Sequence, residues 1–187
     1  MDDAVARPDA DLLAVSRDFS LLVSVVAALT DDQAREPSLL PGWTRGHVLT
    51  HLARSGDGDT RTVEGAIRDE VVDKYPEGSE GRERDIDAGA GRPVAELLDD
   101  LAAAQGRLHA AWAAMPDDAW GRWARTPPGP RTAAQGVRTR RREILVHLVD
   151  LDLGFGPADL PADYLAFDAE FVHESRTRST WPDAPWP

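Results

Sequence analysis

The sequence predicts an all-α fold: a four-helix bundle with long crossover connections and an extra helix near the C-terminal end. Two observations lead to this prediction. Apolar residues recur at steps of three and four along four long segments, which is typical of helices that bury one face. No segment shows sustained alternation of apolar and polar residues, so no sheet is expected. The predicted helices lie near residues 9–29, 44–73, 93–115 and 132–153.

The first two helices are marked by their apolar spacing and by a capping residue. In the first helix, Leu12, Val15 and Phe19 begin an apolar stripe that continues to Leu29. Thr44 stands where the N-cap of the second helix belongs, because its hydroxyl can accept a bond from a free backbone N–H. The middle of the second helix, SGDGDT, is rich in glycine and has a weak helix propensity. We expect tertiary packing to keep it helical.

Prolines and glycines set the limits of the later segments. Residues 74–91 are polar and glycine-rich, and we expect them to form a long connection that crosses the bundle. Pro93 marks the first turn of the third helix, where a missing backbone N–H costs nothing. Gly154 is the expected C-cap residue of the fourth helix. Pro161 opens the fifth segment.

The composition excludes several classes of function. The chain has 187 residues with 21 Lys and Arg against 33 Asp and Glu, which gives a net charge of −12. This charge disfavours nucleic acids and anionic lipids as partners. No apolar run reaches the ~18–20 residues of a membrane span, and no secretory signal is visible, so a cytoplasmic protein is expected. The motifs of phosphate-binding loops and of the serine nucleophile elbow do not occur.

The cysteine count is zero. This rules out disulfides, cysteine-bound zinc, iron–sulfur clusters and a thiol nucleophile carried by the protein. If the protein uses thiol chemistry, the thiol must therefore arrive as a small molecule.

Two of the predicted helices place titratable groups one turn apart. His47 and His51 share one helix, while Glu143, His147 and Asp150 form a polar stripe on another. Two imidazoles and one carboxylate suit a divalent metal, zinc first, and leave one coordination position open, as in catalytic sites. The spacing alone leaves two alternatives open. The pair on the fourth helix is either metal-binding or solvated, and His47 is either a ligand or a residue of the first helical turn.

An arginine run precedes the glutamate of this stripe. At about 100° per residue, Arg140 lies ~60° from Glu143 around the helix, whereas Arg141 lies ~160° away and points elsewhere. Arg140 could thus hold a substrate carboxylate with its planar fork, or it could belong to a solvated basic face. Arg82 and Arg84, in the connection before the third helix, carry the same two interpretations.

Three segments of the chain resemble a known family. The segments are LLPGWTRGHVLTHLAR, ERDIDAGAGRPVAELLDDL and RTRRREILVHLVDLDLG. They resemble the mycothiol-dependent maleylpyruvate isomerase family, whose metal-binding domain belongs to the DinB-like superfamily. The resemblance runs in order from about Asp9 to Leu153, and the three motifs together are far more specific than any one of them.

The resemblance implies a four-helix bundle that binds zinc through one histidine of the second helix and a Glu-x-x-x-His pair of the fourth. In this sequence these ligands are His51, Glu143 and His147. The implied activity is the cis–trans isomerisation of maleylpyruvate to fumarylpyruvate, with mycothiol as the thiol cofactor. Some relatives are thiol S-transferases.

The full-length enzymes of this family resemble a two-domain design in which a C-terminal α/β domain contributes a catalytic arginine. Only 30 residues follow Pro157 here, enough for one helix and a tail, so we expect that domain to be absent. We therefore divide the chain into a metal-binding bundle, residues 1–157, and a C-terminal helix and tail, residues 158–187.

The predicted function is a cis–trans isomerase that needs zinc, or another divalent metal, together with mycothiol and an unsaturated acidic small-molecule substrate. We predict that Arg140 contacts the substrate and that Arg82 contacts the cofactor. The alternatives are a thiol S-transferase of the same superfamily and a bundle that binds a metal or small ligand without catalysis. We expect a monomer or homodimer with neither a nucleic-acid nor a membrane partner.

Overall fold

The computed structural model describes residues 5–127 and 129–166. Short 3-10 turns lie at Asp117–Ala119 and Pro157–Asp159. The helices and strands follow one another as α1 (Asp9–Val26), α2 (Asp31–Arg35), α3 (Arg45–Ile67), α4 (Gly78–Ala90), α5 (Val94–Ala113), β1 (Trp123–Thr126), β2 (Gly129–Thr132) and α6 (Ala133–Asp150).

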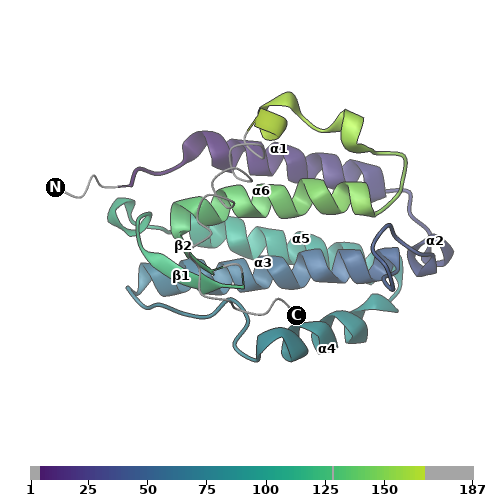
Figure 1. The fold of residues 1–187 in the computed structure, drawn as a ribbon, viewed down its shortest axis with the longest axis horizontal. Helices are drawn as coiled ribbons and strands as arrows, with labels where there is room; N and C mark the ends of the chain where they lie inside the picture. Colours follow the sequence, from purple (N-terminus) through teal and green to yellow (C-terminus); the bar gives the residue numbers. More distant parts are fainter. Residues whose placement is uncertain (1–4, 128, 167–187) are drawn as a thin grey trace.

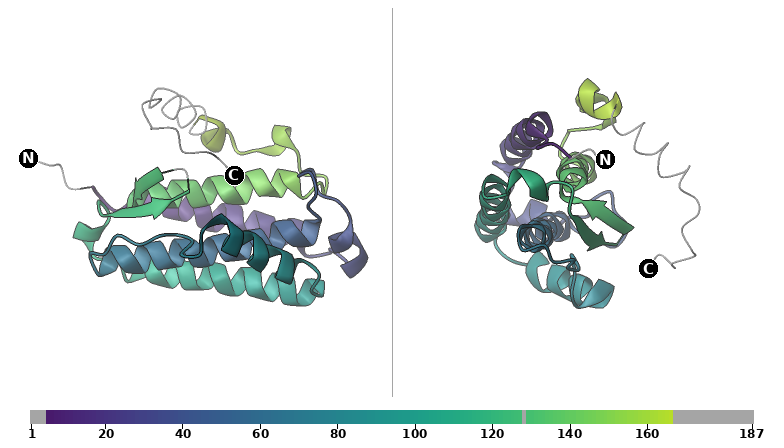
Figure 2. Two further views of the ribbon diagram at one scale, coloured as in Figure 1. Left: turned by 60° about the horizontal axis from the view of Figure 1, so that its bottom comes forward. Right: turned by 90° about the vertical axis from the view of Figure 1, so that its left-hand side faces the viewer.

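The four long helices α1, α3, α5 and α6 run side by side as a bundle, seen from the side in Figure 1 and end-on in the right-hand view of Figure 2. Helix α3 is central, because it packs against α4, α5 and α6, whereas α1 packs chiefly against α6. The predicted all-α bundle with long crossovers is confirmed. Within the described residues, no helix is both long and apolar enough to cross a membrane.

The core is built from aliphatic side chains that the four long helices turn inward. Each such side chain stabilises the fold by roughly 1.5–3 kcal/mol when it is removed from water. The predicted stripe of α1 is only partly confirmed, because Val15 is buried whereas Leu12 and Phe19 pack at the edge of the core. The fully buried core side chains of the long helices include Val15, Leu22, Leu49, Leu52, Leu97, Leu101, Leu108, Ile144 and Leu148.

Residues 74–91 cross the bundle as predicted, but they are not a simple connection, because most of them form helix α4. The segment is polar and has a weak helix propensity. It is helical because its inward face, with Ile86, Gly89 and Ala90, is buried against α3. Gly46 makes this close approach possible, since a Cβ at that position would collide with the backbone carbonyl of Ala90.

The expectation of no sheet was wrong. Strands β1 and β2 form a two-stranded antiparallel hairpin beside α3 and the start of α6 (Figure 1). Two backbone hydrogen bonds join the chain after α3 to this hairpin. The N–H of Lys74 donates to the carbonyl of Arg125 at 3.0 Å, and the N–H of Arg125 donates to the carbonyl of Val72 at 3.0 Å. Each strand has only 4 residues, too few for the alternation of side chains to stand out in the sequence.

Capping explains where two of the long helices begin. Thr44 is the N-cap of α3 as predicted, and it shares a capping box with His47, whose Nδ1 accepts from the Thr44 N–H at 3.1 Å. Thr132 caps α6 in the same way with Gln135. The predicted C-cap glycine was wrong, because α6 ends at Asp150, before Gly154.

The fifth segment lies at the edge of the described chain. A helical stretch begins at residue 162, and Tyr164 is buried with its ring 5.7 Å from the Arg141 guanidinium carbon. Phe167, Phe171 and the two tail tryptophans, Trp181 and Trp186, lie outside the described residues. The division at residue 157 stays a prediction.

A pair of glycine substitutions tests the contact between α3 and α4. Gly46→Ala introduces a Cβ against the Ala90 carbonyl and should lower the free energy of unfolding by about 1–3 kcal/mol. Gly106→Ala, in α5, meets no atom within 4 Å and should raise it by about 0.5–1 kcal/mol. Urea unfolding followed by circular dichroism at 222 nm measures both. Equal stability of the two variants would contradict the close approach.

Candidate metal centre

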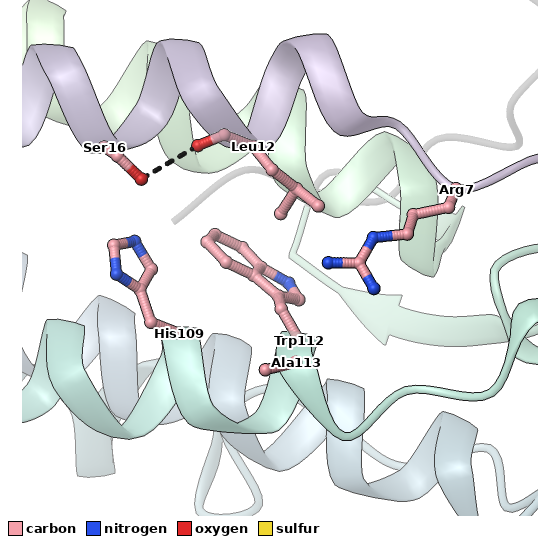
Figure 3. Close-up of a pocket in the computed structure, with 6 residues that line it drawn as sticks. All are labelled: Arg7, Leu12, Ser16, His109, Trp112 and Ala113. Atoms are coloured by element: carbon pink, nitrogen blue, oxygen red, sulfur yellow. Dashed lines mark hydrogen bonds between the residues drawn. The ribbon is translucent and has the colours of Figure 1, made fainter.

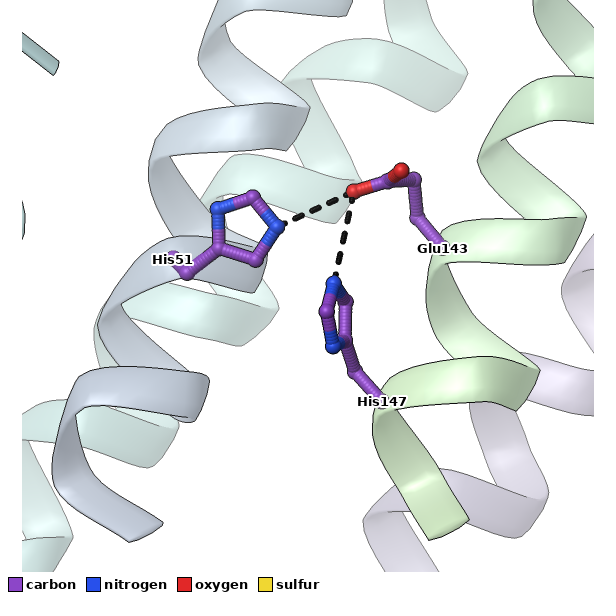
Figure 4. Close-up of side chains that lie close together, drawn as sticks. All are labelled: His51, Glu143 and His147. Atoms are coloured by element: carbon purple, nitrogen blue, oxygen red, sulfur yellow. Dashed lines mark hydrogen bonds and ion pairs between the residues drawn. The ribbon is translucent and has the colours of Figure 1, made fainter. Parts of the chain in front are cut away.

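Three side chains from two helices converge between α3 and α6 (Figure 4). His51 comes from the second turn of α3, and Glu143 and His147 come from successive turns of α6. Their potential ligand atoms all lie within 4.8 Å of one another. The structure thus brings together the three residues that the sequence analysis named as ligands.

Two of the separations between these atoms are close to those of a tetrahedral metal site. The Nε2 atom of His51 lies 3.0 Å from Oε2 of Glu143, and Nε2 of His147 lies 3.7 Å from the same oxygen. Ligands at ~2.0–2.2 Å from zinc in tetrahedral geometry are about 3.3–3.6 Å apart. Small side-chain movements would therefore adapt the three groups to an ion.

Each imidazole is held from behind by a further polar group. Asp150, the third member of the predicted stripe, does not join the convergence but bonds Nδ1 of His147 at 2.8 Å. Arg82 lies 3.0 Å from Nδ1 of His51 through its Nη2. The Asp150 bond is of the kind that fixes the orientation of a metal-binding imidazole, because the ring donates its Nδ1 proton to the carboxylate. The ring of Trp43 closes one side, 5.5 Å from that of His51.

Burial and hydrogen bonding set the charge of each member. Burial, with the nearby positive charges of His147 and Arg82, lowers the pKa of His51 to about 4, so this imidazole is neutral at pH 7. Burial opposes the charge of Glu143, but bonds from His147 and His51 outweigh it and hold the carboxyl pKa well below its usual range. Burial also opposes a charge on His147, yet Asp150 and Glu143 raise its pKa to about 9.

This donor set fits a divalent metal. The carboxylate is ready to coordinate, whereas His51 becomes a ligand through Nε2 once its proton moves to Nδ1. His147 becomes a ligand when it loses its extra proton. Two nitrogens and one oxygen form the three-ligand set of catalytic zinc sites, which keep a position for water or substrate. The side chains of Glu143 and His147 are 23% and 15% exposed, so the group is not sealed from solvent.

The arginines of the run before Glu143 occupy different places. Arg140 is fully buried, with Nε bonded to Oε1 of Gln105 at 3.0 Å and Nη1 bonded to the carbonyl of Leu52 at 2.9 Å. Its predicted contact with substrate stays a prediction. Arg141 points toward α1 and pairs with Asp18 at 2.7 Å, which confirms that it faces away from the convergence.

The sequence analysis missed a buried ion pair next to these residues. Lys74 pairs with Asp59 at 2.6 Å and donates to the Ser55 hydroxyl at 3.1 Å. Burial opposes the lysine charge, but Asp59 outweighs it and raises the pKa of Lys74. The sequence feature that could have indicated this pair is the glycine-rich middle of α3. Glycine is needed there because a Cβ at Gly58 would lie 2.7 Å from the side chain of Lys74.

Two hollows lie on different sides of the bundle. A cleft of about 190 Å³ between α3 and the beginning of α4 is lined by Arg61, Tyr75, Arg82 and their neighbours. Arg82 stands between this cleft and the convergence, because its guanidinium also contacts His51. A smaller hollow of about 120 Å³ between α1 and α5 is lined by Ser16, His109 and Trp112 among others (Figure 3). It shares no residue with the candidate metal centre.

Comparisons with solved structures agree with this architecture. The crystal structures of the mycothiol-dependent maleylpyruvate isomerase and of a variant of it each match with a TM-score of 0.83 and 25% identity, covering 88% of this chain and 68% of that chain. YfiT from Bacillus subtilis, described as a probable metal-dependent hydrolase with an unusual four-helix bundle topology, matches with a TM-score of 0.66 and 18% identity over 82% of this chain and 90% of that chain. This second likeness concerns the fold alone. No match was found among curated proteins.

A comparison with family models identifies the chain more directly. The model of the mycothiol maleylpyruvate isomerase N-terminal domain matches residues 16–152, which hold the whole bundle after the first turns of α1 and all three converging side chains. The chain therefore belongs to the mycothiol maleylpyruvate isomerase N-terminal domain family.

Proposed function

We propose that this protein is a zinc-dependent enzyme that uses mycothiol to isomerise a cis-unsaturated acid of the maleylpyruvate type. The observation that carries the proposal is the convergence of His51, Glu143 and His147 in a chain of this family. The matching solved isomerase is mycothiol-dependent by its own description, which supports a thiol as the second component. The sequence has no cysteine that could replace an external thiol.

The proposed reaction is an addition followed by an elimination. The thiol adds across the cis double bond, the resulting single bond rotates, and elimination returns the thiol and the trans product, so no oxidant or reductant is needed. When bound, the metal supplies a Lewis acid that holds the thiol as thiolate at neutral pH. His51, Glu143 and His147 would hold the metal, and Asp150 would keep His147 in the orientation that presents Nε2.

Arg82 has two alternative partners in this proposal. In the structure its bond to Nδ1 of His51 places the proton of that neutral ring on Nε2, which faces Glu143. A histidine that binds a metal through Nε2 carries its proton on Nδ1, which cannot accept a bond from a guanidinium. Metal binding through Nε2 of His51 would therefore release the Arg82 guanidinium, which could then bind the cofactor or the substrate.

Removal of one ligand tests the metal site. His147→Ala should lower the amount of bound zinc at least tenfold, because three protein ligands become two, while the helix content stays nearly unchanged. Elemental analysis of the dialysed protein and circular dichroism measure these quantities. The matched control is His109→Ala in α5, whose side chain bonds Gln105 and lies away from the convergence. Equal zinc in both variants would rule out the site.

Zinc binding should release a proton. With a pKa of about 9, His147 is protonated at pH 7 in the metal-free protein, and coordination needs the neutral ring. The apparent association constant should rise about tenfold per pH unit up to pH ~9, where His147 is already neutral. Calorimetric titrations in buffers of different ionisation enthalpy count the protons. The Asp150→Asn variant should release fewer protons on binding zinc, because loss of the Asp150 charge lowers the pKa of His147. A zinc affinity that does not change with pH would contradict the positive charge assigned to His147.

Turnover distinguishes the proposed isomerase from its alternatives. Zinc-loaded protein with mycothiol should convert maleylpyruvate to its trans isomer, measured by the change in ultraviolet absorbance, and omission of the thiol or the His147→Ala substitution should abolish the reaction. A stable thioether with an electrophilic acid, without isomerisation, would indicate a thiol S-transferase. No thiol-dependent reaction despite bound zinc would indicate a binding protein.

A further inference from the structure

Three arginines stand apart in this acidic chain. Most described arginines pair with a carboxylate, as expected where acidic residues exceed basic ones by 33 to 21. Arg61, Arg82 and Arg140, in contrast, lie within 4.0 Å of no carboxylate oxygen of the described residues. Arg82 bonds His51, and Arg140 lies one turn before Glu143, so two of the three adjoin the candidate metal centre.

Arg61 belongs to the same region through the cleft. Arg61 and Arg82 both line the cleft of about 190 Å³ between α3 and the beginning of α4, with Tyr75. Nη1 of Arg61 donates to the carbonyl of Lys74 at 2.7 Å, which anchors one nitrogen of the guanidinium. Among the described residues its other N–H groups have no recorded partner. Arg61 is exposed, and this bond holds one edge of its guanidinium at the cleft while the planar fork can still bind an anion.

The acidic side chains of the cleft do not neutralise these arginines. Asp57 is engaged by Arg54 at 3.2 Å and by Arg107 at 2.5 Å. Glu77 pairs with Arg84, outside the lining of the cleft. Asp85 is exposed and forms none of the recorded ion pairs of the described residues. Neither Arg61 nor Arg82 is therefore paired with a carboxylate of the described residues, and the exposed Asp85 sets one negative charge against their two positive ones.

We propose that this cleft is a carboxylate subsite in which Arg61, assisted by Arg82, binds a carboxylate of the acidic substrate. The inference rests on the proposed function, because it places the reacting double bond at the candidate metal centre beside His51. Arg82 links the two parts, since its guanidinium touches His51 and lies 5.8 Å from the ring centre of Tyr75 in the cleft. Arg61 is then a substrate-binding residue that selects acids over neutral unsaturated compounds.

Calorimetric titration with maleate, a small cis-unsaturated dicarboxylate, tests the subsite. Zinc-loaded Arg61→Gln should bind maleate about 10- to 100-fold more weakly than the wild type, because charge-assisted hydrogen bonds are lost. The matched control is Arg68→Gln, which removes the same charge from the C-terminal end of α3, where the exposed arginine pairs with Glu70 at 2.8 Å. This control should bind maleate and zinc like the wild type.

Several outcomes would overturn the inference. Equal maleate affinity in Arg61→Gln and the wild type, or no binding of maleate to the zinc-loaded wild type, would remove the subsite while leaving the metal centre intact. Inorganic phosphate that binds more tightly than maleate and depends on Arg61 would show that the cleft serves phosphate groups instead of carboxylates.

Two further measurements keep the result clear. If Arg61→Gln disturbs the chain around Lys74 and fails to fold, the Arg61→Lys variant tests the subsite instead. Lysine keeps the positive charge but lacks the planar guanidinium, so this variant should bind maleate several-fold more weakly than the wild type. Titration of the metal-free protein separates this inference from the proposed function. A weaker but Arg61-dependent affinity for maleate without zinc supports the subsite even if the zinc titration or the isomerase assay fails.

Discussion

The partly buried carboxylate of Glu143 between two imidazoles is the interaction on which the polar interior of this bundle depends. A carboxylate withdrawn from water costs several kcal/mol unless hydrogen bonds and opposite charges compensate it. Here the compensation comes from His51 on the facing helix and His147 one turn away. Helices α3 and α6 must therefore present polar groups at the same level, and the aliphatic core of α1, α3, α5 and α6 closes around them.

The glycine-rich middle of α3 serves the same polar interior. A Cβ at Gly56 would lie 3.3 Å from the Arg140 guanidinium, and Gly58 lies against the side chain of Lys74. Absence of side chains at these two positions lets two cations approach the helix without loss of its hydrogen bonds. The weak helix propensity of this segment is thus the cost of placing positive charge near Glu143, and packing against α4, α5 and α6 offsets it.

The sequence predicted what depends on local spacing and missed what depends on distant contacts. The i, i+4 relation of Glu143 and His147, the cap at Thr44 and the direction of Arg141 away from Glu143 follow from helix geometry and local spacing. The family resemblance indicated His51 and not His47 as the metal ligand of this helix. The structure gives a physical reason, because the His47 side chain already bonds the backbone of Thr44 in the capping box of α3. Helix α4 and the Lys74–Asp59 pair depend on packing against α3, which no local pattern indicates. The strands of the β1–β2 hairpin are too short for alternation to stand out in the sequence.

The local distribution of charge in the bundle suits an anionic ligand, although the whole chain is acidic. The chain carries a net charge of −12, yet Arg61 and Arg82 line the cleft between α3 and α4, and Lys74 and Arg140 lie against the middle of α3. Of the negative groups there, Asp59 is held by Lys74 and Asp150 by His147. A divalent ion held by Glu143 would add two positive charges to this region and displace a proton from His147. The loaded site would then be more positive than the empty one, so metal and anionic ligand would strengthen each other's binding, as linkage requires of any two ligands whose charges interact.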